Sequence, residues 1–324
     1  MTHIRLGAVV LVLSAMLAIA GCGGSSSTTG STAKLKVVYV PGLTGNPFYS
    51  TVGCGAMSVA NSLGVDLSIQ GSPTWDVAKQ TSIVDAIITT KPAALMISIN
   101  DPKGSIVPLA QAKAAGIKVV TIDGDVEDTS IAVTNIQSDN LKGGQLAGEK
   151  MGALLNGQGT VVVIDNDPGF PISEQRVQGF VTALKAFPGI KVLDTQYSHN
   201  DTSKAAGIVS ASITSHSDLK GVYTVETNNT EGAITGVRES GKTGQVNIVG
   251  YDTSDPIVAA LHAGTLAADV VQYPYGEGKL GLQSAVDAVH GKSVPRNQSQ
   301  PFVIATQQNV DTPEVQQYIY KLTC

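Results

Sequence analysis

The chain has 324 residues and a formal net charge of −5, with 42% apolar and only 5% aromatic residues. Its basic residues are scattered and form no electrostatic footprint for nucleic acid, so we exclude a nucleic-acid partner. The five histidines (His3, His199, His216, His262 and His290) have no spacing suited to a metal. We therefore expect neither a metal site nor a cofactor.

Residues 1–21 are typical of an export signal. A short basic start precedes about 15 apolar residues (6–20), the length of a signal-peptide core and too short to span a bilayer comfortably. The run ends in the motif IAGC (19–22), which resembles a bacterial lipobox, whose cysteine is lipidated and becomes the first residue of the mature protein. An ordinary secretory signal with a chance cysteine at position 22 is the alternative.

Residues 22–34 contain almost only Gly, Ser, Thr and Ala. Such a segment cannot bury apolar surface, so it is predicted to be a flexible tether. With a lipid on Cys22, the tether would hold a globular domain outside the cytoplasmic membrane, at the cell surface or in the periplasm. We therefore expect an extracytoplasmic protein that contacts the membrane through its lipid anchor.

The mature chain of about 300 residues is long for one core and favours two lobes. Short apolar runs alternate with helical segments, which predicts βαβ units and parallel sheets. Strands are expected at 35–40, 65–71, 93–99, 117–123, 160–165, 190–197, 221–225, 246–252, 266–272 and 301–306. Helices are expected at 47–63, 76–90, 104–115, 141–155, 173–186, 202–215, 230–240, 254–263, 276–290 and 313–322. The rhythm restarts after residue 140, so the prediction is an α/β fold of two similar lobes, with the last third shared between them or capping one.

Two cysteines remain once Cys22 is assigned to the lipid. In an oxidising compartment Cys54 and Cys324 favour one disulfide, which would tie the last residue to an early helix. Two separate thiols, one of them buried, are the alternative.

Polar segments follow the predicted strands, where parallel sheets bind ligands. They are GLTGNPFYS (42–50), SIND (98–101), DGD (123–125), DNDPGF (165–170), ETNN (226–229), YDTSD (251–255) and QYPY (272–275). Carboxylates and amides can bind vicinal hydroxyls, the later Arg176 can bridge two of them, and aromatic rings can cover a sugar ring. This set of side chains favours a polyhydroxy ligand.

Six stretches occur in the order seen in one family. They are GNPFYS, VTID, IQSDN followed by GGQLAG, QRVQGF, IVGYD and VVQYPY. In them the chain resembles the type I periplasmic solute-binding proteins of ABC importers, in particular the ribose-binding-protein-like group, over about residues 35–310. The resemblance implies two Rossmann-like lobes joined by a three-segment hinge near Ser138, Gln272 and Val303.

The resemblance also implies where each lobe begins and ends. The first lobe would comprise 35–138 plus 273–302, and the second 139–272 plus 303–324. Ligand would lie between them, and hinge closure would shift the population to a closed form that a membrane permease recognises. The expected partners are a sugar or polyol and the transmembrane subunits of an ABC permease, and the expected state is a monomer.

The resemblance assigns roles in the first lobe. Asn46 would exchange hydrogen bonds with hydroxyls, while Phe48 and Tyr49 would flank the ring. Asp123 would accept from two hydroxyls, with Ser98 or Asn100 nearby.

In the second lobe the resemblance implies that Arg176 donates hydrogen bonds to two ring or hydroxyl oxygens of the ligand. Asp252 would accept hydrogen bonds with help from Gln272 at the hinge, and Tyr251 would pack against the ring.

The chain departs from the ribose-binding pattern in ways that make the pocket more acidic and less aromatic. Gly124-Asp125 follows the aspartate where ribose binders have arginine, and Asp167 stands at an apolar position. Glu226 occupies a position where the pattern has an asparagine, and Asn200 occupies one where it has an aromatic residue. Both remain candidate ligand residues together with Asp167, and Glu226 could meet hydroxyls or a cationic group. GLTGNPFYS and VTIDGD also resemble relatives that bind autoinducer-2 or rhamnose.

Several of these residues have structural readings as well. Asn46, Asp123 and Asp252 could cap helices, and Arg176 could pair with Glu174 on a helix surface. Trp75 is expected to pack at a lobe edge or line the rim. Gly143-Gly144 is interpreted as close helix packing, since no dinucleotide fingerprint precedes it.

Three functions remain open. The protein is the binding component of a carbohydrate importer, a module that presents its ligand to a chemoreceptor or sensor kinase, or an enzyme that uses Asp123 and Asp252 for acid–base chemistry. We expect no enzyme, because the polar groups all have a role in holding a ligand and no nucleophile elbow or metal cluster occurs in the sequence.

Overall fold

A computed structural model of the protein describes residues 34–324. The predicted signal peptide, the predicted lipidation site Cys22 and the predicted tether up to residue 33 lie outside the described residues. Within residues 34–324, no helix combines the length and apolar character that crossing a membrane requires.

The first lobe is built on a six-stranded parallel sheet with the strand order β12-β5-β4-β3-β1-β2. Its strands are β1 (Leu35–Val40), β2 (Val65–Ile69), β3 (Ala94–Ile97), β4 (Lys118–Ile122), β5 (Thr134–Ser138) and β12 (Asn297–Gln300). The middle strands are buried on both faces, as expected of a parallel sheet covered by helices.

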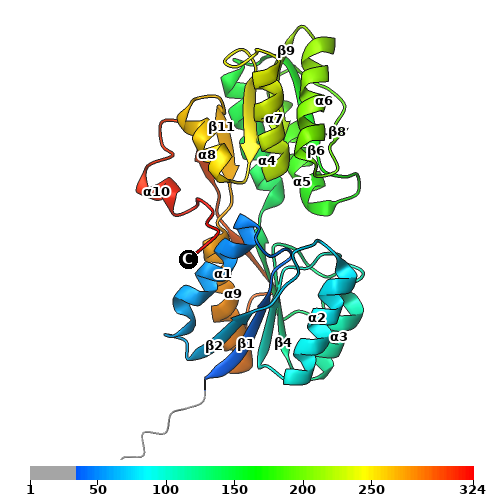
Figure 1. The fold of residues 1–324 in the computed structure, drawn as a ribbon, viewed down its shortest axis with the longest axis vertical. Helices are drawn as coiled ribbons and strands as arrows, with labels where there is room; N and C mark the ends of the chain where they lie inside the picture. Colours follow the sequence, from blue (N-terminus) through cyan, green and yellow to red (C-terminus); the bar gives the residue numbers. More distant parts are fainter. Residues whose placement is uncertain (1–33) are drawn as a thin grey trace, which may run out of the picture. The chain divides into compact units, whose positions relative to one another are not determined.

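Two helices cover each face of this sheet (Figure 1). On one face lie α1 (Pro47–Ala60) and α9 (Pro274–Val289), and on the other α2 (Val77–Thr90) and α3 (Ile106–Ala114). The two apolar clusters alternate along the middle strands: in β1, Val37 and Tyr39 belong to the α1 side, Val38 and Val40 to the α2 side. This period of two is what a strand buried on both faces produces.

The second lobe is built on a sheet with the order β13-β11-β10-β9-β6-β7, and β8 also pairs with β6. Its strands are β6 (Gln158–Asp165), β7 (Gly189–Val192), β8 (Gln196–Tyr197), β9 (Leu219–Thr224), β10 (Asn247–Tyr251), β11 (Ala268–Val271) and β13 (Val303–Ala305). All pairs are parallel except β11 with β13, which is antiparallel.

The helices of the second lobe are α4 (Asn140–Leu154), α5 (Pro171–Leu184), α6 (Thr202–Ser215), α7 (Thr227–Glu239), α8 (Asp255–His262) and the short α10 (Pro313–Gln316). Helices α4 and α5 pack tightly together on one face, and α6 and α7 pack together on the other. A Cβ atom on Gly144 of α4 would overlap the carbonyl oxygen of Arg176 on α5. The interpretation as close helix packing is therefore confirmed for Gly144, whereas Gly143 packs against the side chains of Tyr251 and Phe302.

The predicted fold of two α/β lobes is confirmed, and the chain passes between the two sheets three times. The passages lie between β5 and α4, between β11 and α9, and between β12 and β13. Helix α9 and strand β12 thus return to the first lobe after the second has been built.

Two neighbouring strands at one side of the first sheet, β5 and the edge strand β12, were not predicted from the sequence. TNIQS in β5 and NQSQ in β12 lack the apolar runs that marked the other strands. They form a parallel pair, with Asn135 aligned on Asn297, next to β4. Pairing with a neighbouring strand, which a sequence pattern does not reveal, makes these polar segments strands.

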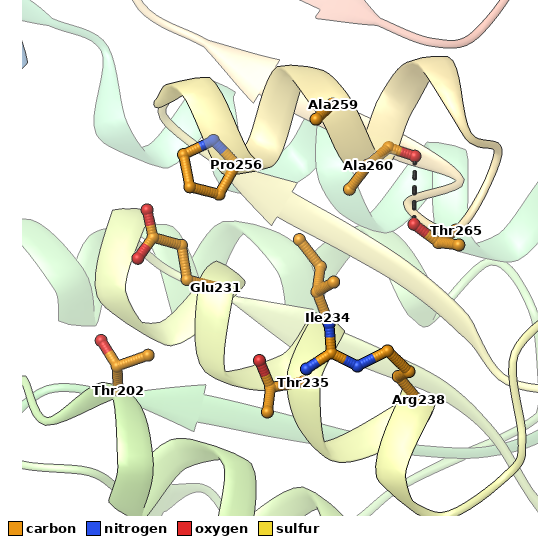
Figure 2. Close-up of a pocket in the computed structure, with 9 residues that line it drawn as sticks. All are labelled: Thr202, Glu231, Ile234, Thr235, Arg238, Pro256, Ala259, Ala260 and Thr265. Atoms are coloured by element: carbon orange, nitrogen blue, oxygen red, sulfur yellow. Dashed lines mark hydrogen bonds between the residues drawn. The ribbon is translucent and has the colours of Figure 1, made fainter.

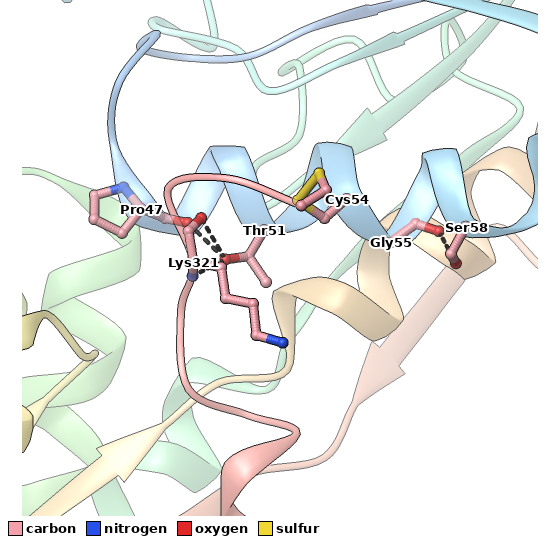
Figure 3. Close-up of a disulfide and its surroundings, with 7 residues drawn as sticks. Pro47, Thr51, Cys54, Gly55, Ser58 and Lys321 are labelled. Atoms are coloured by element: carbon pink, nitrogen blue, oxygen red, sulfur yellow. Dashed lines mark hydrogen bonds between the residues drawn. A yellow bond between two sulfur atoms is a disulfide. The ribbon is translucent and has the colours of Figure 1, made fainter.

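The predicted helix at 313–322 is wrong beyond Gln316, where α10 ends. The tail then runs onto the first lobe, where Lys321 hydrogen-bonds with Thr51 and Cys324 forms the predicted disulfide with Cys54 of α1 (Figure 3). The Cα atoms of the two cysteines are 5.3 Å apart. The last residues therefore contact α1, although the sequence-based boundary assigned them to the second lobe.

Candidate functional site

A cavity of 630 Å³ is lined by residues of both lobes. Its walls are formed by the segments that follow the parallel strands, the position at which α/β sheets bind ligands. From the first lobe come Leu43, Asn46, Phe48, Tyr49, Trp75, Ile99, Asn100, Pro102, Asp123, Gly124, Asp125, Glu127 and Gln137. From the second come Asn166, Asp167, Phe170, Pro171, Ile172, Gln175, Arg176, Asn200, Glu226, Thr227 and Asp252, with Gln272 at the passage into α9.

A second, smaller cavity of 390 Å³ lies within the second lobe, between α7 and α8 (Figure 2). Its charged residues are Glu231 and Arg238. Glu231 already accepts a hydrogen bond from Ser254, which caps α8. The larger cavity is the candidate site, because it gathers the strand-end acids and amides.

The entrance to helix α1 forms one wall of the cavity. Asn46 caps the helix, with its Oδ1 accepting from the backbone N–H of Phe48 at 2.8 Å, so the capping role and the position in the cavity coexist. The rings of Phe48 and Tyr49 pack edge to face, 5.2 Å between centroids. Tyr49 donates its hydroxyl to Asp123 Oδ2 at 3.0 Å, and Trp75 lies 6.2 Å from its ring, 47% exposed at the rim.

Asp123 and Asp252 occupy equivalent places in the two lobes. Each follows the last residue of its strand, β4 or β10, and each has a left-handed backbone, with φ of 67° and 69°. Each donates its backbone N–H to the next strand of its sheet, Asp123 to Ile136 at 2.8 Å and Asp252 to Val270 at 3.0 Å. Positive φ is costly for residues other than glycine and is concentrated at functional sites, where the surroundings enforce it.

Arg176 is only 4% exposed and is held on four sides. Its Nε donates to Asn140 Oδ1 at 2.9 Å and its Nη1 to the Val225 carbonyl at 2.7 Å. The guanidinium stacks on Tyr251, 4.0 Å from the ring centroid, and Nη1 lies 3.7 Å from Asp252 Oδ2. Burial alone would lower the pKa of Arg176, but the neighbouring Tyr251 and Asp252 raise it above its usual value, so the cation is permanent.

Asp252 is oriented from its other side. Its Oδ1 accepts from Gln272 Nε2 at 2.7 Å and from the Tyr320 hydroxyl at 2.6 Å. The remaining oxygen, Oδ2, faces Arg176. This arrangement fixes a carboxylate oxygen beside a cation at the cavity wall.

Buried polar atoms that line the cavity lack partners within the described chain. They are Oδ1 and Nδ2 of Asn100 and Oε1 of Gln272. A buried polar atom without a hydrogen bond costs about 1–3 kcal/mol, so native structures retain few of them. Two acceptors and one donor, in the same cavity as Asp123 and Asp252, suit a ligand that carries several hydroxyls.

Two acids in the cavity have shifted pKa values. Burial raises the pKa of Glu226 to about 7, against the lowering effect of the backbone N–H groups of Asn229 and Asn228, which its carboxylate caps at 2.9 and 3.1 Å. Burial also raises the pKa of Asp123 to about 6, although Arg176 and the Tyr49 hydroxyl lower it. These carboxyls therefore change charge near neutral pH.

The other departures from the ribose-binding pattern also line the cavity. Asp167 forms a short contact with His199, and Asn200 has φ of 57° beside Glu226. Asp125 is held by Arg296, whose Nη2 donates to its Oδ2 at 2.6 Å. The surplus of acids over the single arginine is thus a property of the assembled cavity.

Two predicted site residues are not brought to the cavity. Ser98 is buried in the first lobe, where its hydroxyl bonds with that of Tyr39 at 3.1 Å and its carbonyl accepts from Gln80 at 2.9 Å. Tyr251 lies behind Arg176, whose guanidinium covers its ring. Asn100 rather than Ser98 lines the cavity with Asp123, and Tyr251 packs against the guanidinium of Arg176.

Other lining residues were not singled out from the sequence. Asn166 and Phe170 belong to the segment DNDPGF after β6, so their position after a strand was a usable signal. Ile172 and Gln175 lie on the first turns of α5, and Gln137 lies in the unpredicted strand β5. Within residues 34–324 no group of three His, Cys, Asp or Glu side chains could hold a metal ion.

Comparisons with known proteins agree with this architecture. Residues 37–293 match the family model described as periplasmic binding protein domain. The ribose import binding protein of Bacillus subtilis is 29% identical over 81% of this chain and 84% of its own length. The D-ribose/D-allose-binding protein of Pseudomonas aeruginosa is 30% identical over 67% of this chain and 70% of its own. The crystal structure of an ABC transporter solute-binding protein from Agrobacterium vitis, bound with α-D-tagatopyranose, superposes with a TM-score of 0.84 at 31% identity and covers 89% of this chain and 100% of that one.

Two α/β lobes that share a polar cavity at their strand ends define a ligand-binding protein of the two-lobed periplasmic type. The chain belongs to the periplasmic binding protein family, and its fold is the type I fold of the sugar-binding members.

Proposed function

We propose that the protein is the extracytoplasmic substrate-binding lipoprotein of an ABC importer, which captures a sugar or polyol between its lobes by hinge closure and delivers it to a membrane permease. The permease subunits and the membrane are its partners, and it acts as a monomer and without catalysis. The relatives support this proposal, because they are named as import or solute-binding proteins for monosaccharides such as ribose, allose and tagatose.

The main support for the proposal is the set of hydrogen-bond donors and acceptors in the cavity wall. Asp123, Asp252 and Arg176 are fixed in place, and Asn100 and Gln272 present buried atoms without partners. A polyhydroxy ligand supplies donors and acceptors together, so it can satisfy all of them at once. Aromatic rings of Phe48 and Tyr49 offer the apolar surface for the C–H faces of a sugar ring.

A ligand that also carries an amino group is the second candidate. Glu226 lies in the cavity wall in place of a neutral amide, and burial raises its pKa, which supports a cationic ligand group at this position. An ammonium group beside Glu226 would lower that pKa and gain a charge-assisted hydrogen bond.

A binding screen tests the proposal. Trp75 is the single tryptophan of the chain and lies at the cavity rim, so its fluorescence should report occupancy. We expect a neutral pentose or hexose, among D-ribose, D-allose, D-tagatose and D-arabinose, to change this fluorescence and raise the melting temperature by mass action.

The panel also contains amino sugars and an autoinducer-2-like furanosyl compound. A response to amino sugars alone would replace the first candidate by the second. A response to none, or consumption of the bound sugar by the purified protein, would contradict the proposed function. An Asp252→Asn variant serves as the site control and should lose the response.

A further inference from the structure

The last five residues, 320–324, form a strap that contacts both walls of the cavity, and the family resemblance assigns no role to it. At one end, Tyr320 is 6% exposed and donates its hydroxyl to Asp252 Oδ1 at 2.6 Å and its backbone N–H to Thr253 Oγ1 at 3.0 Å. Both partners follow β10 in the second lobe. Tyr320 itself does not line the cavity, so it can act on a ligand only through Asp252.

The same tyrosine contacts the first lobe. Its ring packs edge to face on that of Phe48, 5.6 Å between centroids, in the first turn of α1. One residue later the backbone N–H of Lys321 donates to Thr51 Oγ1 at 2.6 Å, and this hydroxyl lies 3.2 Å from the Lys321 carbonyl oxygen. The strap therefore joins an acceptor of one wall to an aromatic residue of the other.

A covalent bond fixes the strap to α1. Cys324 is joined to Cys54, which is buried on α1 less than two turns after Phe48 (Figure 3). Since α1 carries Asn46 at its cap and Phe48 and Tyr49 in its first turn, the disulfide ties the helix that forms one wall to the segment that orients Asp252 in the other. With the three passages of the chain between the sheets, this makes a fourth covalent connection between the lobes in the described structure.

We propose that the strap is a positioning element of the binding site: Tyr320 holds the Asp252 carboxylate in its binding orientation, and the Cys54–Cys324 disulfide holds Tyr320 between the two walls. Loss of the Tyr320 hydroxyl leaves Gln272 as the one donor to Asp252 Oδ1 among the described residues. Loss of the disulfide releases the end of the strap. Both changes should loosen the same carboxylate.

The test compares four full-length proteins with the wild type: Tyr320→Phe, Cys54→Ser/Cys324→Ser, the combination of all three substitutions, and Lys321→Ala. Tyr320→Phe keeps the ring contact with Phe48 and removes only the hydroxyl. Lys321→Ala is the matched control, because Lys321 contacts Thr51 through its backbone alone. The cysteine pair is changed together so that neither Cys54 nor Cys324 is left as an unpaired thiol.

The first readout needs no ligand. In hydrogen–deuterium exchange, peptides covering 250–254 and 47–52 should exchange faster in the cysteine-pair variant than in the wild type, because release of the strap uncovers both segments. Lys321→Ala should exchange like the wild type. Unchanged exchange of both peptides in the cysteine-pair variant would overturn the proposal.

The second readout rests on the proposed function. Titration with D-ribose and D-tagatose, followed by Trp75 fluorescence, should show affinity about three- to tenfold weaker in Tyr320→Phe and in the cysteine-pair variant. Because both changes act through one carboxylate, the combined variant should bind sugar no more weakly than whichever of the two has the lower affinity. Fully additive losses, or wild-type affinity in Tyr320→Phe, would overturn the positioning role. If the wild type binds neither sugar, the same titration is made with the panel sugar that it does bind. If it binds no sugar of the panel, the proposed function fails, and the exchange experiment still decides whether the strap holds the two walls.

Discussion

Replacement of Glu226 by glutamine tests the electrostatics of the cavity. The substitution keeps the Oε1 atom that caps α7 and removes the charge. Burial raises the pKa of the native carboxyl from 4.5 to about 7. At 1.36 kcal/mol per pKa unit, this difference corresponds to at most about 3.4 kcal/mol. Because Glu226 is only partly buried, we expect about 2 kcal/mol after screening by solvent.

The sign of the effect follows from proton binding. An acid with a raised pKa holds its proton more tightly in the folded state, so its contribution to stability is present at low pH and is lost as the pH rises from about 4.5 through about 7. Between pH 5 and pH 8 the wild type should therefore lose about 2 kcal/mol of unfolding free energy more than Glu226→Gln. The other buried acids, such as Asp269 and Glu277, are common to both proteins and cancel in the comparison.

The assay is urea unfolding of both proteins at pH 5, 6, 7 and 8, with no sugar present. Glu314→Gln, a change of the same kind on the exposed face of α10, serves as the control and should follow the wild type. Parallel curves for the wild type and Glu226→Gln, or a wild type that gains stability relative to the variant as the pH rises, would refute the reasoning.

Three further predictions concern the same site. Arg176→Met should cost about 3–5 kcal/mol of stability in urea unfolding, because it leaves the buried Asp252 without its cation. The variant should also lose the fluorescence response to sugar. A stable variant that binds sugar contradicts this prediction. Cys54→Ser/Cys324→Ser should lose about 2–5 kcal/mol of unfolding free energy, since the disulfide spans 270 residues. In thermal unfolding, reductant should lower the melting temperature of the wild type and leave that of the variant unchanged. If ligands bind the ionised form of Asp123, whose pKa is about 6, affinity should fall about tenfold from pH 7 to pH 5 by calorimetry, and a flat profile excludes that role.

Much of the fold could be predicted because its signals are local. Apolar runs such as LKVVYV in β1 and TVVVID in β6 must be buried on both faces, and the helices between them carry apolar faces of matching period. The sequence-based prediction failed in segments without such runs. Strands β5 and β12 are polar and became strands through pairing, and the tail after Gln316 left its helical pattern because Thr253, Thr51 and Cys54 hold it elsewhere.

The candidate site was predictable in part for a related reason. Residues that follow a strand within one or two positions, such as Asp123, Glu226 and Asp252, must lie at the carboxyl edge of the sheet, so their sequence position already places them. Side-chain direction is not encoded in that way. Ser98 and Asn100 are two residues apart, yet one bonds with Tyr39 inside the lobe and the other lines the cavity.

The sequence alone therefore determined the α/β class, the repetition of two lobes and the strand-end acids, because each depends on neighbours along the chain. The tertiary structure decided where the last residues lie and which amide atoms remain without partners. It also showed that Tyr320, 68 residues from Asp252 in the chain, donates to its carboxylate. Such contacts join segments far apart in sequence, and no local pattern carries their distance or direction.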